Sequence, residues 1–351
     1  MVTIDWESWL CSGKQWLCSG KRWLRSGKQW LSSVKQWLAR FPLPGGLRLW
    51  ITLGSLAFVL VALIGHWSQF AQLSIRGFAW CWLVLGVGLS WGSLLVNALA
   101  WRVLVDWLGH RPKKVALVSL FLRSNLQKYL PGGIWHFVDR LRALRPHMGV
   151  GPALASVLLE PLLMAAAALL FVPFGGWQSG LSLACCLPAV MLIPRWREPL
   201  LMRLERAKAS QLNKVDLDLV GPVDQEAFGS GRVGYPWSAL AMEMLFVVCR
   251  FAGFWCCVIA FSLNTNLSVG EWLAAFALAW TVGLVVPGAP GGLGVFEATL
   301  LLRLGSQVPE APLLGIALCY RVIVTVADCL AAAGVVGDRM VQKHLARSVP
   351  D

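Results

Sequence analysis

Long runs without a charged side chain dominate the chain. Residues 49–75, 77–101, 161–194, 251–270 and 272–296 contain no Asp, Glu, Lys or Arg. A run of about 18 or more such residues is long enough to cross a hydrocarbon core ~30 Å thick as a helix. The runs lack the alternation of barrel strands, and lipid cannot satisfy the polar groups of an open backbone. The pattern therefore predicts an all-α, polytopic integral membrane helical bundle.

The same pattern predicts where the helices lie. We expect membrane helices near residues 47–66, 79–101, 152–175, 177–194, 237–263, 270–287 and 311–336. Two further apolar segments, 115–134 and 288–305, are interrupted by Pro and Gly, and are expected to be broken or re-entrant. The resulting domains are an N-terminal tail (residues 1–46), a membrane domain (47–340) that includes a cytoplasmic loop (195–236), and a C-terminal tail (341–351).

Composition and charge agree with a membrane protein. The chain is 57% hydrophobic and 14% charged, whereas a soluble globular chain carries about a quarter charged residues. The net charge of +13 does not indicate a nucleic-acid partner, because the basic residues lie in the connections between apolar runs. Their distribution predicts a multi-pass protein of the cell membrane with a cytoplasmic N-terminus. The ten Cys form no CxxC pair and the five His are single, so no metal or cofactor is predicted.

The N-terminal tail contains a strict repeat of seven residues. A Trp-Leu pair recurs at each step, beginning at Trp9, Trp16, Trp23, Trp30 and Trp37. One interpretation is a basic, Trp-rich helix that lies on an anionic membrane face. The other is a loosely structured tail, because Gly recurs in the repeat and disfavours helix. The sequence leaves both open.

A second internal repeat lies in the two broken segments. Pro131-Gly132-Gly133 and Pro290-Gly291-Gly292 are each followed by apolar residues and then by a carboxylate, Asp139 or Glu297. Pro and Gly interrupt a helix and expose backbone polar groups at membrane depth. Broken helices at corresponding places of two halves indicate a substrate site in transporters. One occurrence would favour an ordinary interfacial loop, whereas the repetition favours a functional site and two pseudo-repeated halves.

Several charged residues lie inside apolar helices. Glu243 and Arg250 are seven residues apart, as are Arg321 and Asp328, and Glu160 lies alone. Seven residues make two helical turns, so each pair shares a face but is ~10 Å apart, too far for contact without a neighbouring helix. Because charges are unfavourable in lipid, we expect them to face a shared interior. For Glu243, near its helix start, a packing or snorkelling role is favoured over a functional one.

The residues around the two motifs resemble the lysylphosphatidylglycerol synthase transmembrane-region family. The first signature comprises Asn125, residues 128–136, Arg140, Ser156 and Glu160, and the second comprises residues 286–298 and Tyr320-Arg321. The resemblance covers about residues 47–340. In the family this region stands alone or is fused to a soluble aminoacyl-transfer domain, and the fused form moves aminoacylated phosphatidylglycerol between leaflets. Relatives accompany enzymes that use polyprenyl-linked sugars. This chain departs from the pattern at Phe296, where many members have Arg.

Resemblance and charge pattern together predict a site for a lipid head group. Arg250 and Arg321 are expected to hold a phosphate, because the planar fork of Arg binds two oxygens at once. Carboxylates are expected to position an amine or to balance the arginines. The predicted site residues are Asn125, Pro131, Gly132, Gly133, Asp139, Arg140, Glu160, Arg250, Pro290, Gly291, Gly292, Glu297 and Arg321.

The expected function is lipid binding and translocation between leaflets, for a phospholipid or a polyprenyl-linked lipid. The chain ends at Asp351 without a soluble synthetase domain, so no enzymatic activity of its own is expected. The expected partners are anionic or polyprenyl-linked membrane lipids and a separate lipid-modifying enzyme. No Walker motif occurs, so ATP hydrolysis within the chain is not expected. Two alternatives stay open: a membrane-embedded transferase acting on lipid-linked head groups, and a non-transporting membrane scaffold.

Overall fold

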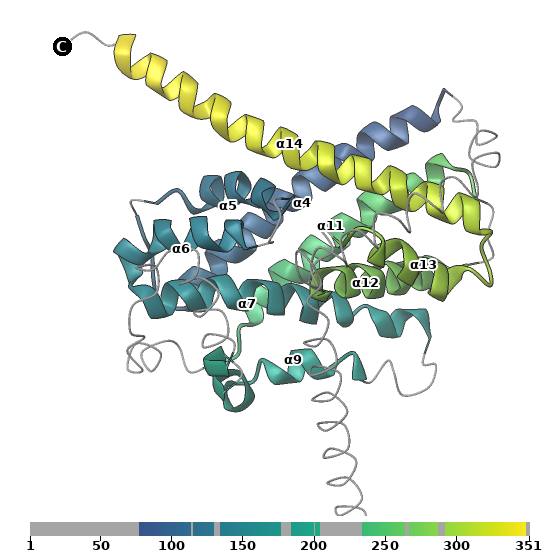
Figure 1. The fold of residues 1–351 in the computed structure, drawn as a ribbon, viewed down its shortest axis with the longest axis horizontal. Helices are drawn as coiled ribbons and strands as arrows, with labels where there is room; N and C mark the ends of the chain where they lie inside the picture. Colours follow the sequence, from purple (N-terminus) through teal and green to yellow (C-terminus); the bar gives the residue numbers. More distant parts are fainter. Residues whose placement is uncertain are drawn as a thin grey trace, which may run out of the picture. The chain divides into compact units, whose positions relative to one another are not determined.

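The computed structural model describes residues 77–113, 115–129, 134–176, 184–199, 201–203, 234–263, 267–286 and 292–348, with side chains to residue 338 (Figure 1). The chain divides into two units, residues 1–50 and 51–351, and every described residue belongs to the second. The predicted tail repeat, the helix near 47–66 and most of the predicted loop 195–236 lie outside the described residues. The described residues contain helices and no strand, which confirms the all-α prediction.

The elements follow one another along the chain, with most helices long and apolar. They are α4 (Ala79–Trp107), α5 (Leu117–Asn125), η1 (Leu126–Tyr129), α6 (Trp135–Met148), α7 (Val150–Leu169), η2 (Val172–Gly175), α9 (Leu187–Met191), α11 (Trp237–Ala260), α12 (Val269–Val285), α13 (Val295–Leu304) and α14 (Glu310–Ser348). Within the described parts, four helical segments are long and apolar enough to cross a membrane: residues 79–107, 150–175, 237–260 and 310–338. These four match predicted helices, which confirms a polytopic membrane protein.

The helix predicted over residues 177–194 is wrong in its described part, which begins at residue 184. Only the five-residue α9 forms there, with Pro188 in its first turn, and a further short helix starts at Pro194. A proline lacks the N–H that an interior helical position donates, so two prolines six residues apart divide this apolar run into short pieces. Hydropathy alone could not reveal this, because the residues between them are apolar.

Small residues allow α4 and α11 to pack closely along their lengths. Gly253 of α11 lies so close to α4 that a Cβ added to it would be 2.5 Å from Ser90 Oγ and 3.2 Å from the Gly86 carbonyl oxygen. Gly86 in turn faces Gly253 and Cys256, so the two helices run antiparallel, as Figure 1 shows. Membrane helices associate through such small residues, since lipid provides no hydrophobic drive between helices.

Two helical hairpins carry the Pro-Gly-Gly motifs between their arms. The first consists of α5 with η1 and α6, and the second of α12 and α13. With 9 residues in α5 and 10 in α13, these two arms are only ~15 Å long, about half the hydrocarbon thickness. Each hairpin interrupts an apolar segment, as predicted for broken or re-entrant segments.

The connectivity makes the two halves inverted repeats. In the first half, α4 is followed by a hairpin that starts where α4 ends, and then by α7. In the second half, α11 is followed by a hairpin that starts where α11 ends, and then by α14. Because α4 and α11 are antiparallel, the two hairpins enter from opposite membrane faces. We call the face at the end of α4 and the start of α11 face X, and the opposite one face Y.

An aromatic cluster joins the helices of the second half. Phe254 of α11, Phe276 of α12, Phe296 of α13 and Tyr320 of α14 are stacked against one another. The ring centroids are 5.1 Å apart for Phe254–Phe276, and 5.9 Å apart for both Phe276–Phe296 and Phe296–Tyr320. This packing fixes the start of α13 against α14, where two charged residues of the predicted site lie.

Candidate functional site

In the second hairpin, Arg321 of α14 binds the start of α13. Its Nε donates to Oε1 of Glu297 at 2.9 Å, and its Nη2 donates to the carbonyl oxygen of Gly292 at 2.6 Å. The other carboxylate oxygen of Glu297 accepts from the backbone N–H of Gly294 at 2.7 Å. Glu297 is 1% exposed, whereas the Arg321 side chain is 23% exposed. The ion pair therefore ties the broken segment to the following long helix.

Gly292 can only be a glycine for two reasons. Its φ of +73° lies in the left-handed region that other residues avoid. A Cβ on it would also lie 2.9 Å from the Cα of Gly283 in α12, a backbone atom that cannot move aside easily. The motif thus lets the two arms of the hairpin touch while it presents a carbonyl oxygen to Arg321.

In the first hairpin, Arg140 of α6 makes the corresponding contact with α7. Its Nη1 donates to Oε2 of Glu160 at 3.1 Å, and its Nε donates to the hydroxyl of Ser124 at 3.0 Å. The guanidinium also lies over the ring of Phe121, with 3.9 Å to the ring centroid. Its side chain is 2% exposed and that of Glu160 is 6% exposed, so the pair is buried.

The two ion pairs are equivalent in place and opposite in polarity. In each half, a short helix after the Pro-Gly-Gly motif supplies one charge, and the next long helix supplies the other. The short helix carries the arginine in the first half (Arg140) and the carboxylate in the second (Glu297). The sequence repeat did not reveal this inversion, because the motif aligned Asp139, not Arg140, with Glu297.

A third cluster of charges lies around Asp328 of α14. Its carboxylate, with a fully buried side chain, accepts from Lys128 Nζ at 2.7 Å and from Asn125 Nδ2 at 2.9 Å. Arg250 of α11 approaches it with Nη2 only to 3.9 Å, beyond hydrogen-bonding distance. Two cations therefore share one carboxylate. The sequence predicted Arg250 and Asp328 on separate helices that face a shared interior. In the structure they lie next to each other in this cluster.

Arg250 and Tyr320 have unused donors. Arg250 is 5% exposed and Tyr320 is 3% exposed. Neither Nε nor Nη1 of Arg250 has a hydrogen-bond partner among the described residues, and the same is true of the Tyr320 hydroxyl. The two side chains interact electrostatically with each other. A buried guanidinium with unused N–H groups is unfavourable unless an acceptor binds it, and phosphate oxygens are the acceptors that its geometry fits.

The structure brings together part of the predicted site. Arg140 with Glu160, Glu297 with Arg321 and Gly292, and Asn125 with Arg250 around Asp328 form the three clusters described above. Asp139 is not among them. It pairs with Arg123 at 3.2 Å, and its side chain is 29% exposed. Pro131, Gly132, Gly133, Pro290 and Gly291 lie outside the described residues.

Three members of the site were not among the predicted residues. Asp328 was noted only as a helix charge, and Tyr320 and Lys128 only as parts of the family signatures. Lys128 instead contacts the buried Asp328, and its side chain is 25% exposed. The spacing of Arg321 and Asp328 gave the available signal, because residues two turns apart share a helix face.

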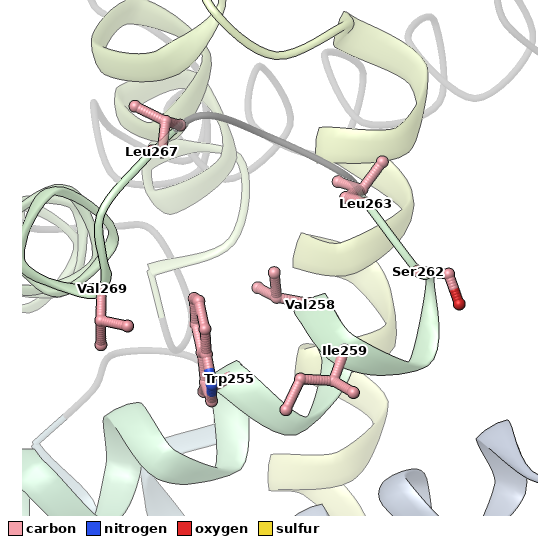
Figure 2. A pocket seen from close by; sticks show the side chains of 7 residues that line it. All are labelled: Trp255, Val258, Ile259, Ser262, Leu263, Leu267 and Val269. Carbon is pink, nitrogen blue, oxygen red and sulfur yellow. The ribbon is translucent and has the colours of Figure 1, made fainter.

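An apolar pocket lies between the end of α11 and the start of α12 (Figure 2). It is lined by Trp255, Val258, Ile259, Ser262, Leu263, Leu267 and Val269, and its volume is about 490 Å³. The hydroxyl of Ser262 points away from the Trp255 ring. Such a lining suits a hydrocarbon chain and not a head group.

The order of these elements can be compared with known families. The family described as the lysylphosphatidylglycerol synthase TM region matches residues 47–332. The chain belongs to this family. In this member of the lysylphosphatidylglycerol synthase TM region family, the matched range includes both hairpins and all three charge clusters. No curated protein shows a significant match to the chain.

Proposed function

We propose that this chain binds a lipid with an anionic, phosphate-containing head group in its interior and moves it between the two leaflets. The observation that carries the proposal is Arg250, a guanidinium at 5% exposure whose Nε and Nη1 have no protein partner among the described residues. Tyr320 adds an unused hydroxyl beside it. A phosphate could accept from both side chains at once.

The surrounding charges favour an anion over a cation. Lys128 and Arg250 together carry two positive charges against the single negative charge of Asp328. Arg321, whose side chain is 23% exposed, is balanced by Glu297. Two cations thus lie against one carboxylate, an arrangement that favours an anionic ligand such as a phosphodiester.

The inverted arrangement of the two halves favours a lipid carrier over a protein that only binds lipid. Each hairpin is attached through one ion pair to the long helix that follows it, so hairpin and helix can move as a unit. Alternating access commonly uses one repeat moving against the other around a fixed site. The Asp328 cluster lies between the halves, because Lys128 and Asn125 come from the first and Arg250 and Asp328 from the second.

The orientation and the chemistry of the chain are part of the proposal. Arg102, Arg111 and Lys113 follow the apolar part of α4 towards face X, so we assign face X to the cytoplasm of the cell membrane. The chain then acts without covalent chemistry of its own, on lipids that a separate enzyme makes.

Translocation of head-group-labelled phosphatidylglycerol in proteoliposomes tests the proposal. We expect the wild type to move the lipid and Arg250→Gln to lose the movement at least tenfold, because the phosphate loses the guanidinium N–H groups that would bind it. Arg102→Gln, which changes an exposed arginine of α4, is the control and should be unaffected.

Other results would favour the alternatives. If folded wild-type protein moves no phosphatidylglycerol, aminoacylated lipid or polyprenyl phosphate, the carrier function is excluded and the scaffold interpretation gains. A chemically altered lipid at the end of the assay would favour the transferase.

A further inference from the structure

Glu243 of α11 is a buried carboxyl group that the proposed lipid site does not use. It is 1% exposed, and its Oε2 has no hydrogen-bond partner among the described residues. No ion pair within 4.0 Å involves it in the described part of the chain. It therefore neither extends to the membrane surface nor fixes an interhelical pair, the two roles that the sequence favoured.

The neighbours of Glu243 explain what state its carboxyl adopts. It interacts electrostatically with Arg140 and Glu160, which are already paired with each other at 3.1 Å. Glu243 thus adds a second carboxyl group near a guanidinium that is already paired. If all three groups were ionised, the cluster would carry one buried, uncompensated negative charge, which is strongly unfavourable. One proton would make the cluster neutral, and of the two carboxyl groups Glu243 is the one without an ion pair within 4.0 Å among the described residues.

Among the described residues of α4, α12 and α14, no cation pairs with Glu243, and the buried Arg197 donates to the Gly234 carbonyl oxygen before α11. On α4, Asp106 is paired with Arg111 at 3.6 Å and Arg102 is exposed. On α12, Glu271 caps the opposite end of the helix through Ser268. On α14, Asp328 and Arg321 belong to the clusters described above. The ionisable neighbours of Glu243 are therefore Arg140 and Glu160.

A second unused acceptor lies at the same level. Ser90 of α4 faces Gly253 of α11, so seven residues further along the antiparallel pair Asn97 is level with Phe246, one turn from Glu243. Asn97 is 4% exposed, and its Oδ1 has no hydrogen-bond partner among the described residues. Its Nδ2 contacts the Met164 sulfur of α7 at 3.9 Å. A protonated carboxyl is the donor that this site lacks.

Glu243 lies closer to face X than Glu160 does, and α7 contains a proline beside Glu160. Glu243 is the seventh residue of α11, so it lies ~9 Å along the helix from face X, whereas Glu160 lies deeper. Pro161 follows Glu160 inside α7 and removes the helical hydrogen bond to Val157. The Arg140–Glu160 pair thus lies where α7 can bend, and a bend that opens the pair would free Arg140 to attract an ionised Glu243.

We propose that Glu243 is a proton-binding site that couples the movement of an anionic lipid to a proton gradient. This inference rests on the proposed lipid carrier function. With Glu243 protonated, the Arg140–Glu160 pair is balanced by itself, and Arg250 faces no ionised carboxylate of its own helix. Glu243 and Arg250 are two turns apart on α11, ~10 Å, so an ionised Glu243 would weaken phosphate binding roughly tenfold at an effective dielectric constant of about 20. By thermodynamic linkage, a bound phosphate must raise the proton affinity of Glu243 by the same factor.

Proton and lipid anion consequently bind together and move in the same direction. A difference of one pH unit across the membrane should then drive the anionic lipid to the leaflet that faces the alkaline side, up to ~10:1 for one proton per lipid. Reversing the gradient should reverse the asymmetry. Each lipid should carry one proton.

The experiment uses proteoliposomes with head-group-labelled phosphatidylglycerol and an internal pH dye, under a pH difference of one unit. We expect wild type to build up lipid asymmetry and to move protons with the lipid. Glu243→Gln, an isosteric mimic of the protonated acid, should exchange lipid without a gradient at the wild-type rate but build up no asymmetry. Exchange by this variant also proves that it is folded. Glu198→Gln changes an exposed carboxylate and should behave as wild type.

Failure of the coupling and failure of the carrier are distinguishable. Lipid exchange by wild type without gradient-driven asymmetry or proton flux overturns the coupling and leaves the carrier in place, as does an equal response of Glu243→Gln. Absence of any lipid exchange by wild type excludes the carrier. In that case, infrared spectra at neutral pH test whether Glu243 binds a proton. A protonated-carboxyl band that is present in the wild type and absent in Glu243→Gln would support the proton site. Identical spectra of the two proteins would exclude it.

Discussion

Arg140 and Glu160 show how single residues of this chain depend on their partners. Both side chains are almost fully buried, and the ion pair is supported by Ser124 and by the ring of Phe121. The sequence identified both residues, because each is a charge in or beside an apolar segment and each belongs to a family signature. It could not identify their pairing, which requires α6 to lie against α7.

Removing one charge of this pair should destabilise the protein more than removing both. Glu160→Gln removes the carboxylate that is hydrogen-bonded to Arg140 and leaves only Glu243, which has no ion pair within 4.0 Å, and breaking a buried pair costs about 3–5 kcal/mol. Replacing both residues by Leu removes the unpaired charge, so we expect a smaller loss. Thermal unfolding of purified protein in detergent measures the difference. Equal stability of Glu160→Gln and wild type would show that the pair opens to water and is not buried as described.

Individual residues of the lipid site were only partly predictable. Arg250, Arg321 and Glu297 were predicted because charges inside the membrane are rare and suggest a function. Asp328 was not assigned to the site, since it contacts Asn125 and Lys128 more than 200 positions away and only the fold brings them together. Asp139 stays a prediction for the site: the structure has it in a partly exposed pair with Arg123, apart from the three clusters.

At the scale of elements, the hairpins depend on glycine more than on hydrophobicity. The Pro-Gly-Gly repeat correctly predicted that two apolar segments would break, since proline and glycine act through local backbone chemistry. The same rule failed for residues 177–194, where prolines were overlooked inside an apolar run. Element boundaries elsewhere were predictable to within a few residues at most ends, because long apolar runs must be helical in lipid.

Substitution of Gly292 tests the second hairpin. Gly292→Ala must accept a left-handed φ of +73° and a Cβ 2.9 Å from Gly283 Cα. Gly109→Ala provides a matched control, because Gly109 has φ +86° but nothing within 4 Å of the added Cβ. We expect the control to lose about 1–2 kcal/mol of unfolding free energy from backbone strain alone, and Gly292→Ala to lose more. Equal losses, measured by thermal unfolding, would show that the arms of the hairpin do not touch at this point.

The close packing of α4 on α11 allows a second test of an element. Gly253→Val would place side-chain atoms where Ser90 Oγ lies 2.5 Å from an added Cβ, whereas Gly88→Val on α4 points into open space. We expect the first variant to be destabilised by about 1–3 kcal/mol, the usual range for overpacking, and the second to be close to wild type. Similar melting temperatures for both variants would contradict the described contact.

At the scale of the whole molecule, two halves of opposite orientation surround the Asp328 cluster. The sequence predicted pseudo-repeated halves from the recurring motif, but not the inversion, because inversion follows from the antiparallel packing of α4 and α11. Contacts across the halves agree with it. Arg303 at the end of α13 donates to the Gly175 carbonyl oxygen at the end of η2, which follows α7, at 3.4 Å, so both ends lie at face Y. Asp328 meets Lys128 and Asn125 of the first hairpin.

The inversion makes a direct prediction about which residues share a membrane face. The hairpin of α5 and α6 should open to face X and that of α12 and α13 to face Y. In a variant without native cysteines, Arg111→Cys and His147→Cys should therefore react with a membrane-impermeant thiol reagent from one side, and Ser262→Cys and Gln307→Cys from the other. Sealed right-side-out and inverted vesicles give the two readings. Arg102→Cys, on the exposed side of α4 near face X, should follow the first pair. If both hairpins were labelled from the same side, the halves would be parallel repeats, and alternating exposure of one central site would lose its structural basis.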